Sequence, residues 1–152
     1  MANTYTQLYI QLVLVVKHRQ NLISEHNREE LQKYITGITQ NRGHKMLAIY
    51  CRPDHTHLLV GLKPSQSISD LARDIKSSST NFINEKRWVR GIFSWQVGFG
   101  AFSYAHGQVG NVIRYIENQE EHHRKKTFKE EYHDFLNEYK VEYNEKYIFE
   151  WI

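Results

Sequence analysis

The pattern of apolar and polar positions divides the chain into alternating strands and helices. Polar residues interrupt the apolar run from Tyr5 to Lys17 mainly in its first half, which predicts a long, mostly buried strand. Residues 24–42 place apolar side chains three and four positions apart behind a possible N-cap at Ser24 or Asn27, which predicts an amphipathic helix. Two β-type runs, 44–52 and 55–62, follow on either side of a Pro-Asp turn and predict an antiparallel hairpin.

The second half of the chain continues this alternation. Residues 67–88 open with Ser67 and Asp70 near capping-box spacing and predict a second helix. The aromatic run 93–105 contains Gly98 and Gly100, so we expect a fourth strand with a bulge or turn near its middle. Helical spacing returns over about 108–126, and a capping box at Thr127 starts a last helix. We expect the aromatic tail, 141–152, to dock on the body of the protein.

The order β-α-β-β-α-β followed by two helices predicts an α+β fold. It matches the ferredoxin-like split βαβ arrangement, an RRM-like palm in which an antiparallel sheet carries two helices on one face. The other face would be free for a ligand, although the added C-terminal helix could lie against it. Because no repeat or linker interrupts the pattern, we expect one domain over 1–152, with a helix at about 108–126 and a C-terminal helix and tail at about 127–152.

Composition narrows the class of protein. The 152 residues are 40% hydrophobic with only 8 Gly and 2 Pro, which is a globular composition. The single cysteine, Cys51, excludes an intramolecular disulfide framework and Cys-rich zinc modules. The most apolar stretch, Leu8 to Val16, is much shorter than the roughly 20 residues of a membrane span and lacks the features of a signal peptide. We therefore expect a soluble, cytoplasmic protein.

The net charge of +3 conceals an asymmetry along the chain. Residues 1–116 carry 14 Lys and Arg against 7 Asp and Glu, whereas residues 117–152 carry 6 against 10. A basic body can attract a polyanion such as nucleic acid, although scattered surface charge explains the same numbers. On the first interpretation, the acidic C-terminal part packs away from the part that holds the nucleic acid.

Two histidines on the second strand of the hairpin are the first candidate for chemistry. His55 and His57 are two positions apart, so on a strand both side chains point to the same face. Neutral imidazole nitrogens at a fixed separation can bind a divalent metal. The competing interpretation is that both are polar side chains facing solvent.

The helix predicted at about 108–126 adds a second candidate. Tyr115 and Gln119 are four positions apart and lie on one face of that helix. Tyr115 is a potential oxygen nucleophile, and the Gln119 carbonyl could complete a metal site with the two histidines. His122 and His123 could compete for the third-ligand role, or line a groove, or face solvent. The alternative for Tyr115 is a place in the core.

Three segments together resemble a known family. They are Pro-Asp-His-Thr-His-Leu-Leu-Val at 53–60, Trp-Gln-Val-Gly-Phe-Gly-Ala-Phe-Ser at 95–103, and Val-Ile-Arg-Tyr-Ile-Glu-Asn-Gln at 112–119. The chain is similar over nearly its whole length to the single-tyrosine transposases of small bacterial and archaeal insertion sequences. These belong to the HUH (His-hydrophobe-His) endonuclease superfamily. The sequence departs from the motif at Thr56, which is β-branched but brings a hydroxyl to the covered face.

This resemblance implies a transposase that nicks and rejoins single-stranded DNA at the hairpin-bearing ends of its element. Tyr115 matches the nucleophile, which forms a 5′-phosphotyrosine, and His55, His57 and Gln119 match the ligands of Mg²⁺ or Mn²⁺. No organic cofactor and no membrane are implied. The family also implies a homodimer in which the tyrosine helix serves the partner's metal site, and the sequence leaves action in cis or in trans open.

Basic residues of the second predicted helix and the segment after it are the expected DNA contacts. They are Arg73, Lys76, Arg87 and Arg90. Two other functions stay open at this point. One is a derived protein that binds DNA hairpins without cutting them, and the other is a metal-dependent phosphodiesterase that uses water in place of Tyr115.

Overall fold

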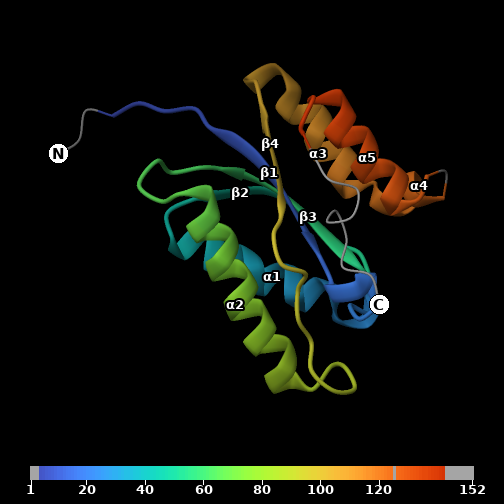
Figure 1. The fold of residues 1–152 in the computed structure, drawn as a ribbon. Helices are drawn as coiled ribbons and strands as arrows, with labels where there is room; N and C mark the ends of the chain where they lie inside the picture. The colour runs from blue at the N-terminus through green and yellow to red at the C-terminus, as the bar shows by residue number, and fades with distance from the viewer. Residues whose placement is uncertain (1–3, 125, 143–152) are drawn as a thin grey trace.

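Four antiparallel strands form one sheet in the order β2-β3-β1-β4 (Figure 1). The strands are β1 (Tyr9–Val15), β2 (Lys45–Cys51), β3 (His55–Gly61) and β4 (Gly100–Tyr104). The computed structural model describes residues 4–124 and 126–142. This sheet, with the helices on it, confirms the predicted α+β fold of the ferredoxin-like kind.

The first helical layer consists of α1 (Glu25–Asn41) and α2 (Ile68–Lys86), which lie on one face of the sheet. Both helices begin where the capping residues predict, because the Ser24 and Ser67 hydroxyls accept backbone hydrogen bonds from the first turn. Alternate residues of β1 and β3 pack against them in the main core, and these include Leu12, Leu14, Leu58 and Val60. This core fixes α1 and α2 against the sheet.

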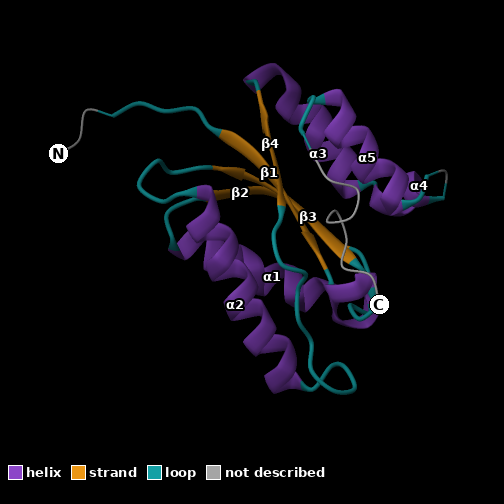
Figure 2. Cartoon of the chain, viewed as in Figure 1, coloured by secondary structure: helices purple, strands orange, loops and turns teal. Residues whose placement is uncertain are grey.

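A second helical layer covers the opposite face (Figure 2). It consists of α3 (Val109–Glu117), α4 (Gln119–His123) and α5 (Phe128–Glu138). The remaining alternate residues of β1, Val13 and Val15, pack with Phe102 of β4 against the apolar side of α5. The face that the sequence left free for a ligand is therefore covered, and any site there lies between the sheet and α3 to α5.

Two elements differ from their predicted extent. Within residues 93–105 only Gly100–Tyr104 is a strand, although Trp95 forms an isolated bridge with Val16. Gly98, whose φ is 86°, turns the chain between these two parts. The helix predicted at about 108–126 breaks at Asn118. At the break the Gln119 side-chain amide donates to the Tyr115 carbonyl, which competes with the regular backbone bond.

Further predictions concern the start of the last helix, the Thr56 hydroxyl and the aromatic tail. Thr127 begins α5 with a capping box to Glu130, as predicted. Thr56 is fully buried, and its hydroxyl oxygen makes no hydrogen bond within residues 4–124 and 126–142. The aromatic tail lies for the most part outside the described residues, which end at 142. In the described part of the chain, no helix combines the length and apolar character needed to cross a membrane.

Candidate metal and tyrosine site

Strand β3 presents His55 and His57 to the second helical layer. Their partners across the ladder on β1 are Val15 and Val13. The two side chains are 1% and 0% exposed, so the interpretation as solvent-facing residues is wrong. Their ring centroids are 5.0 Å apart and the rings lie edge to face. The alternation of the strand thus brings two imidazoles together in a buried position.

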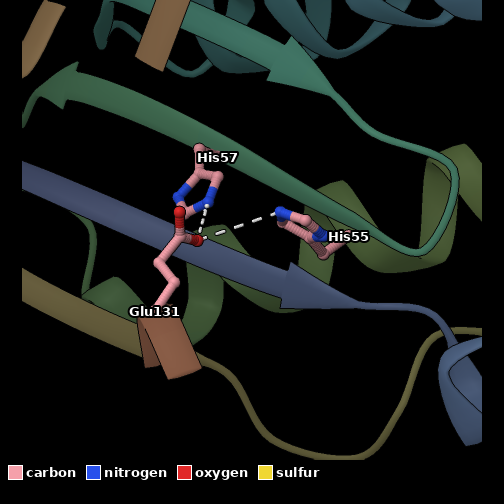
Figure 3. Close-up of side chains that lie close together, drawn as sticks. All are labelled: His55, His57 and Glu131. Atoms are coloured by element: carbon pink, nitrogen blue, oxygen red, sulfur yellow. Dashed lines mark hydrogen bonds and ion pairs between the residues drawn. The ribbon is translucent and has the colours of Figure 1, made fainter. Parts of the chain in front are cut away.

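The third member of the cluster is Glu131, which α5 supplies (Figure 3). The Glu131 carboxylate accepts a hydrogen bond from His57 Nε2 at 2.8 Å, and the same oxygen lies 3.9 Å from His55 Nε2. One ligand atom from each of the three residues lies within 4.8 Å of the others, which suits a single metal ion. The Glu131 side chain is 2% exposed, so all three members of the cluster are buried.

Asp54 orients His55. The His55 Nδ1–H donates to the Asp54 carboxylate at 2.7 Å, which leaves the Nε2 lone pair pointing toward the cluster. Burial, only partly offset by the bond to Asp54, lowers the pKa of His55 to about 4. His55 is therefore neutral near pH 7. Its buried Nε2 makes no hydrogen bond within the part of the chain that the structure describes. A neutral imidazole held by a carboxylate is a typical metal ligand.

Gln11 orients His57 from the neighbouring strand. The Gln11 amide donates to His57 Nδ1 at 2.8 Å, and the Tyr104 hydroxyl donates to the Gln11 carbonyl at 2.7 Å. Gln11 is fully buried and is the polar residue that interrupts the apolar face of β1. These bonds run from β4 through β1 to β3, so the three strands together hold the imidazole in one orientation.

Glu131 is ionised in this setting. Burial opposes its charge, but the hydrogen bond from His57 and further contacts outweigh burial and lower the pKa of Glu131 to about 2. Phe128, one turn earlier on α5, stacks on the His55 ring with centroids 3.7 Å apart. Aromatic packing and one carboxylate therefore attach α5 to the histidine pair.

Tyr115 lies beside the histidines in the same chain. Its ring centroid is 5.9 Å from that of His57 and 5.7 Å from that of Phe135. Burial, followed by the charge of Glu131 and a hydrogen bond to it, raises the pKa of the Tyr115 hydroxyl well above its usual value. The hydroxyl is therefore protonated at neutral pH and must lose its proton to act as a nucleophile.

Gln119 reaches the edge of the cluster and contacts a different partner there. It is fully buried, and its carbonyl oxygen lies 3.0 Å from His123 Nε2. His123 in turn lies 3.4 Å from Glu131. The structure thus brings His55, His57 and Tyr115 together as expected, places Gln119 one contact away, and adds His123. The side chain of His122 lies outside the described part of the structure.

A cavity of about 310 Å³ opens next to Tyr115 between α3 and α5. Its lining includes Tyr115, Asn111 and Tyr139, together with the carboxylates of Glu131, Asp134 and Glu138. The sequence predicts that the acidic C-terminal part packs away from the sheet and helices that hold DNA, but the apolar side of α5 packs directly on the sheet, on the face that carries the histidines. An anionic ligand in this cavity would need a cation beside it.

The predicted DNA contacts belong to the other helical layer. Arg73 on α2 is exposed and pairs with Asp70 at 3.2 Å, while Arg87 and Arg90 are exposed beyond the helix. The Lys76 ammonium already donates hydrogen bonds to the backbone carbonyls of Gln96 and Gly98. A groove of about 520 Å³ passes Arg73 and Lys76 between α2 and residues 94–99. These groups therefore lie on the face of the sheet opposite to the histidine pair.

Sequence reasoning missed Asp54, Gln11 and Glu131. Asp54 was read only as a turn residue, although its position directly before His55 is a usable signal. Gln11 stood out as a polar residue in an apolar run. No signal in the sequence distinguishes Glu131 from the neighbouring carboxylates. Its position near the histidines results from the packing of α5 on the sheet.

Comparisons with known proteins place this geometry in a family. The model of the IS200-like transposases matches residues 4–119. The ISDra2 transposase TnpA of Deinococcus radiodurans is 24% identical over 120 residues, which are 74% of this chain and 84% of that protein. The matched range contains the histidine pair and Tyr115, whereas α5 lies beyond it.

Solved structures agree with the fold. A candidate transposase from Deinococcus radiodurans has a TM-score of 0.62 and 21% identity, covering 78% of this chain and 95% of that chain. A REP-associated tyrosine transposase bound to a REP hairpin has a TM-score of 0.59 and 18% identity, covering 81% of this chain and 73% of that chain. The family match extends over more than half of the sequence and confirms the resemblance to the single-tyrosine transposases. The chain belongs to the family of IS200-like transposases.

Proposed function

We propose that this transposase is a metal-dependent endonuclease and strand transferase for single-stranded DNA, with Tyr115 as its nucleophile. The observation that carries the proposal is the place of Tyr115, whose ring lies 5.9 Å from His57 inside the buried cluster and next to an open cavity. A tyrosine that only packed in the core would not require imidazoles or a cavity beside it.

The donor set fits a divalent cation such as Mg²⁺ or Mn²⁺. His55 offers a neutral, buried Nε2 without a hydrogen bond in the described part of the chain, and His57 lies beside it. These two residues would hold the ion, and Gln119 as the third ligand stays a prediction. A bound divalent cation would polarise the phosphodiester and stabilise the charge that develops on the leaving oxygen.

The residues of the chain account for the covalent step. The Tyr115 oxygen attacks phosphorus, the bond from phosphorus to the 3′ oxygen breaks, and the tyrosine proton leaves. The products are a 5′-phosphotyrosine and a free 3′-OH. A second 3′-OH can later attack the phosphotyrosine, which rejoins the strands and restores the Tyr115 hydroxyl.

Recognition of DNA would use the exposed basic groups of the α2 layer. Arg73, Arg87 and Arg90, with Lys76 in the groove beside α2, would contact phosphates of a hairpin-bearing single strand. The similar REP-associated transposase is bound to a hairpin, which supports this class of substrate. A homodimer is part of the proposal, and the place of Tyr115 near His57 of its own chain supports action in cis.

The test is formation of a covalent adduct with single-stranded DNA from the regions that flank the gene. With Mn²⁺ present, we expect a protein–DNA adduct on a denaturing gel, loss of the adduct in Tyr115→Phe, and its retention in Tyr139→Phe. Tyr139 lines the same cavity, so it is a matched control. An adduct that persists in Tyr115→Phe would refute the nucleophile. Hairpin binding without cleavage by the unaltered protein would favour a protein that binds DNA without cutting it.

A further inference from the structure

We propose that Glu131, carried by α5, is the third protein ligand of the metal that His55 and His57 hold. This inference rests on the proposed function, because it assumes a metal at the histidine pair. It goes beyond the family match, which ends at residue 119 and does not include α5. It also assigns to Gln119 a different role from the one that the sequence predicted.

The Glu131 carboxylate faces the histidine pair. Glu131 Oε1 lies 2.8 Å from His57 Nε2 and 3.9 Å from His55 Nε2, so one carboxylate oxygen faces both imidazoles. The Gln119 carbonyl is instead 3.0 Å from His123 Nε2, and the Gln119 amide donates to the Tyr115 backbone. Glu131 therefore points at the space between the histidines, while both ends of the Gln119 side chain have other contacts.

The Glu131 carboxylate is almost fully buried. A buried carboxylate is costly unless opposite charge and hydrogen bonds compensate it. The ion-pair partners described for Glu131 are imidazoles, those of His55, His57 and His123, while the nearby Lys126 pairs with Asp134. A divalent cation at the cluster would place a further positive charge beside this buried carboxylate.

Core packing of α5 holds Glu131 in place. Its neighbour Tyr132 and the flanking Phe128 and Leu136 pack on Val13, Val15 and Phe102 of the sheet. The Phe128 ring also stacks on His55, with an angle of 5° between the ring planes. Metal ligands work best when their surroundings fix them in advance. Glu131 is fixed by the same apolar contacts that attach α5 to the strands.

The alternative is that Glu131 blocks the site, because it binds the histidines in competition with the metal. The two roles predict opposite signs for one measurement. Removing the carboxylate weakens metal binding if Glu131 is a ligand and strengthens metal binding if Glu131 competes with the metal. Metal affinity therefore separates them without any measurement of DNA cleavage.

The experiment is calorimetric titration of the full chain with Mn²⁺ at neutral pH. We expect Glu131→Gln to bind Mn²⁺ more than about tenfold more weakly than the unaltered protein. Glu130→Gln is the matched control, because Glu130 is exposed on the same helix and its amide oxygen can still accept the hydrogen bonds from the Thr127 backbone N–H and hydroxyl. Equal or tighter binding by Glu131→Gln would overturn the inference. Absence of Mn²⁺ binding by the unaltered protein would overturn the proposed metal site and the inference together.

A second measurement reports the ligand directly. In Glu131→Cys loaded with Co²⁺, a thiolate ligand produces a charge-transfer band in the near ultraviolet, which Gln119→Cys should lack. The native thiol, Cys51, is buried in the core shared with α1 and α2, so the unaltered protein gives the baseline. A band in Gln119→Cys but not in Glu131→Cys would assign the third ligand to Gln119 and refute our proposal. Circular dichroism of each variant confirms that it is folded.

Discussion

At the scale of single residues, the site depends on groups that orient the imidazoles. The Nδ1–H of His55 donates to the Asp54 carboxylate, whereas Nδ1 of His57 accepts a hydrogen bond from the Gln11 amide. Burial opposes the ionisation of Asp54, but the hydrogen bond from His55 outweighs it and lowers the pKa of Asp54. A charged acceptor holds the imidazole more firmly than a neutral one. Asp54 therefore holds the His55 ring in one orientation, with Nε2 toward His57 and Glu131.

Replacing Asp54 with Ala should weaken metal binding by about tenfold to a hundredfold, because the His55 ring loses its orienting carboxylate. Calorimetric titration with Mn²⁺ measures the change. Asp74→Ala is the control, since Asp74 is an acid paired with Arg42 on the α2 layer, away from the histidines. Unchanged affinity in Asp54→Ala would show that the bond to His55 does not orient a ligand.

At the scale of elements, the close contact of α5 with β4 decides where Glu131 lies. Gly100 is the contact point, since a Cβ built there would lie 2.7 Å from the Tyr132 hydroxyl and 2.9 Å from Cε1 of that ring. Any larger residue at 100 must move the ring or the helix. Tyr132 is the direct neighbour of Glu131, so a shift of α5 at this point would move the carboxylate from the histidines.

Gly100→Ala should reduce the free energy of unfolding by about 1–3 kcal/mol, because it overpacks the contact between β4 and α5. Urea denaturation gives this value, and the same sample should bind Mn²⁺ more weakly. Gly107→Ala is the matched control, since a Cβ at Gly107 would meet no heavy atom within 4 Å. If the two variants were equally stable, the distance from Gly100 to Tyr132 would not constrain the docking of α5.

The elements themselves follow from local signals. Ser24, Ser67 and Thr127 begin three helices because each hydroxyl accepts a backbone hydrogen bond of the first turn. The hairpin of β2 and β3 turns at Pro53 and Asp54 as expected. The break at Asn118 was not predicted, because helical spacing in the sequence says nothing about which groups compete for the Tyr115 carbonyl.

At the scale of the whole molecule, the sheet separates two kinds of surface. The histidines and Tyr115 lie under α3 to α5, whereas the groove beside α2 with Arg73 and Lys76 lies on the opposite layer. A strand that uses both surfaces would have to pass around the edge of the sheet. Binding and cutting would then depend on separate parts of the molecule.

The double variant Arg73→Ala and Arg90→Ala should bind single-stranded hairpin DNA more weakly, with a lower salt dependence. Each lost phosphate contact should reduce the slope of log affinity against log salt by about 0.7. Fluorescence anisotropy at several salt concentrations measures both quantities. Lys33→Ala is the control, because Lys33 is an exposed cation on α1 that pairs with Glu29. An unchanged slope in the double variant would place the DNA on another surface.

The sequence by itself determined the local structure and half of the site. Periods of 2 and 3.6 residues encode strands and helices, so the order of elements and the shared face of His55 and His57 could be read without a fold. Only the tertiary structure decided that Glu131, 74 positions from His57, meets that residue, and that Gln119 contacts His123 instead. The physical reason is that such contacts arise from the packing of α5 on the sheet, which joins residues far apart in the chain and leaves no local periodic signal.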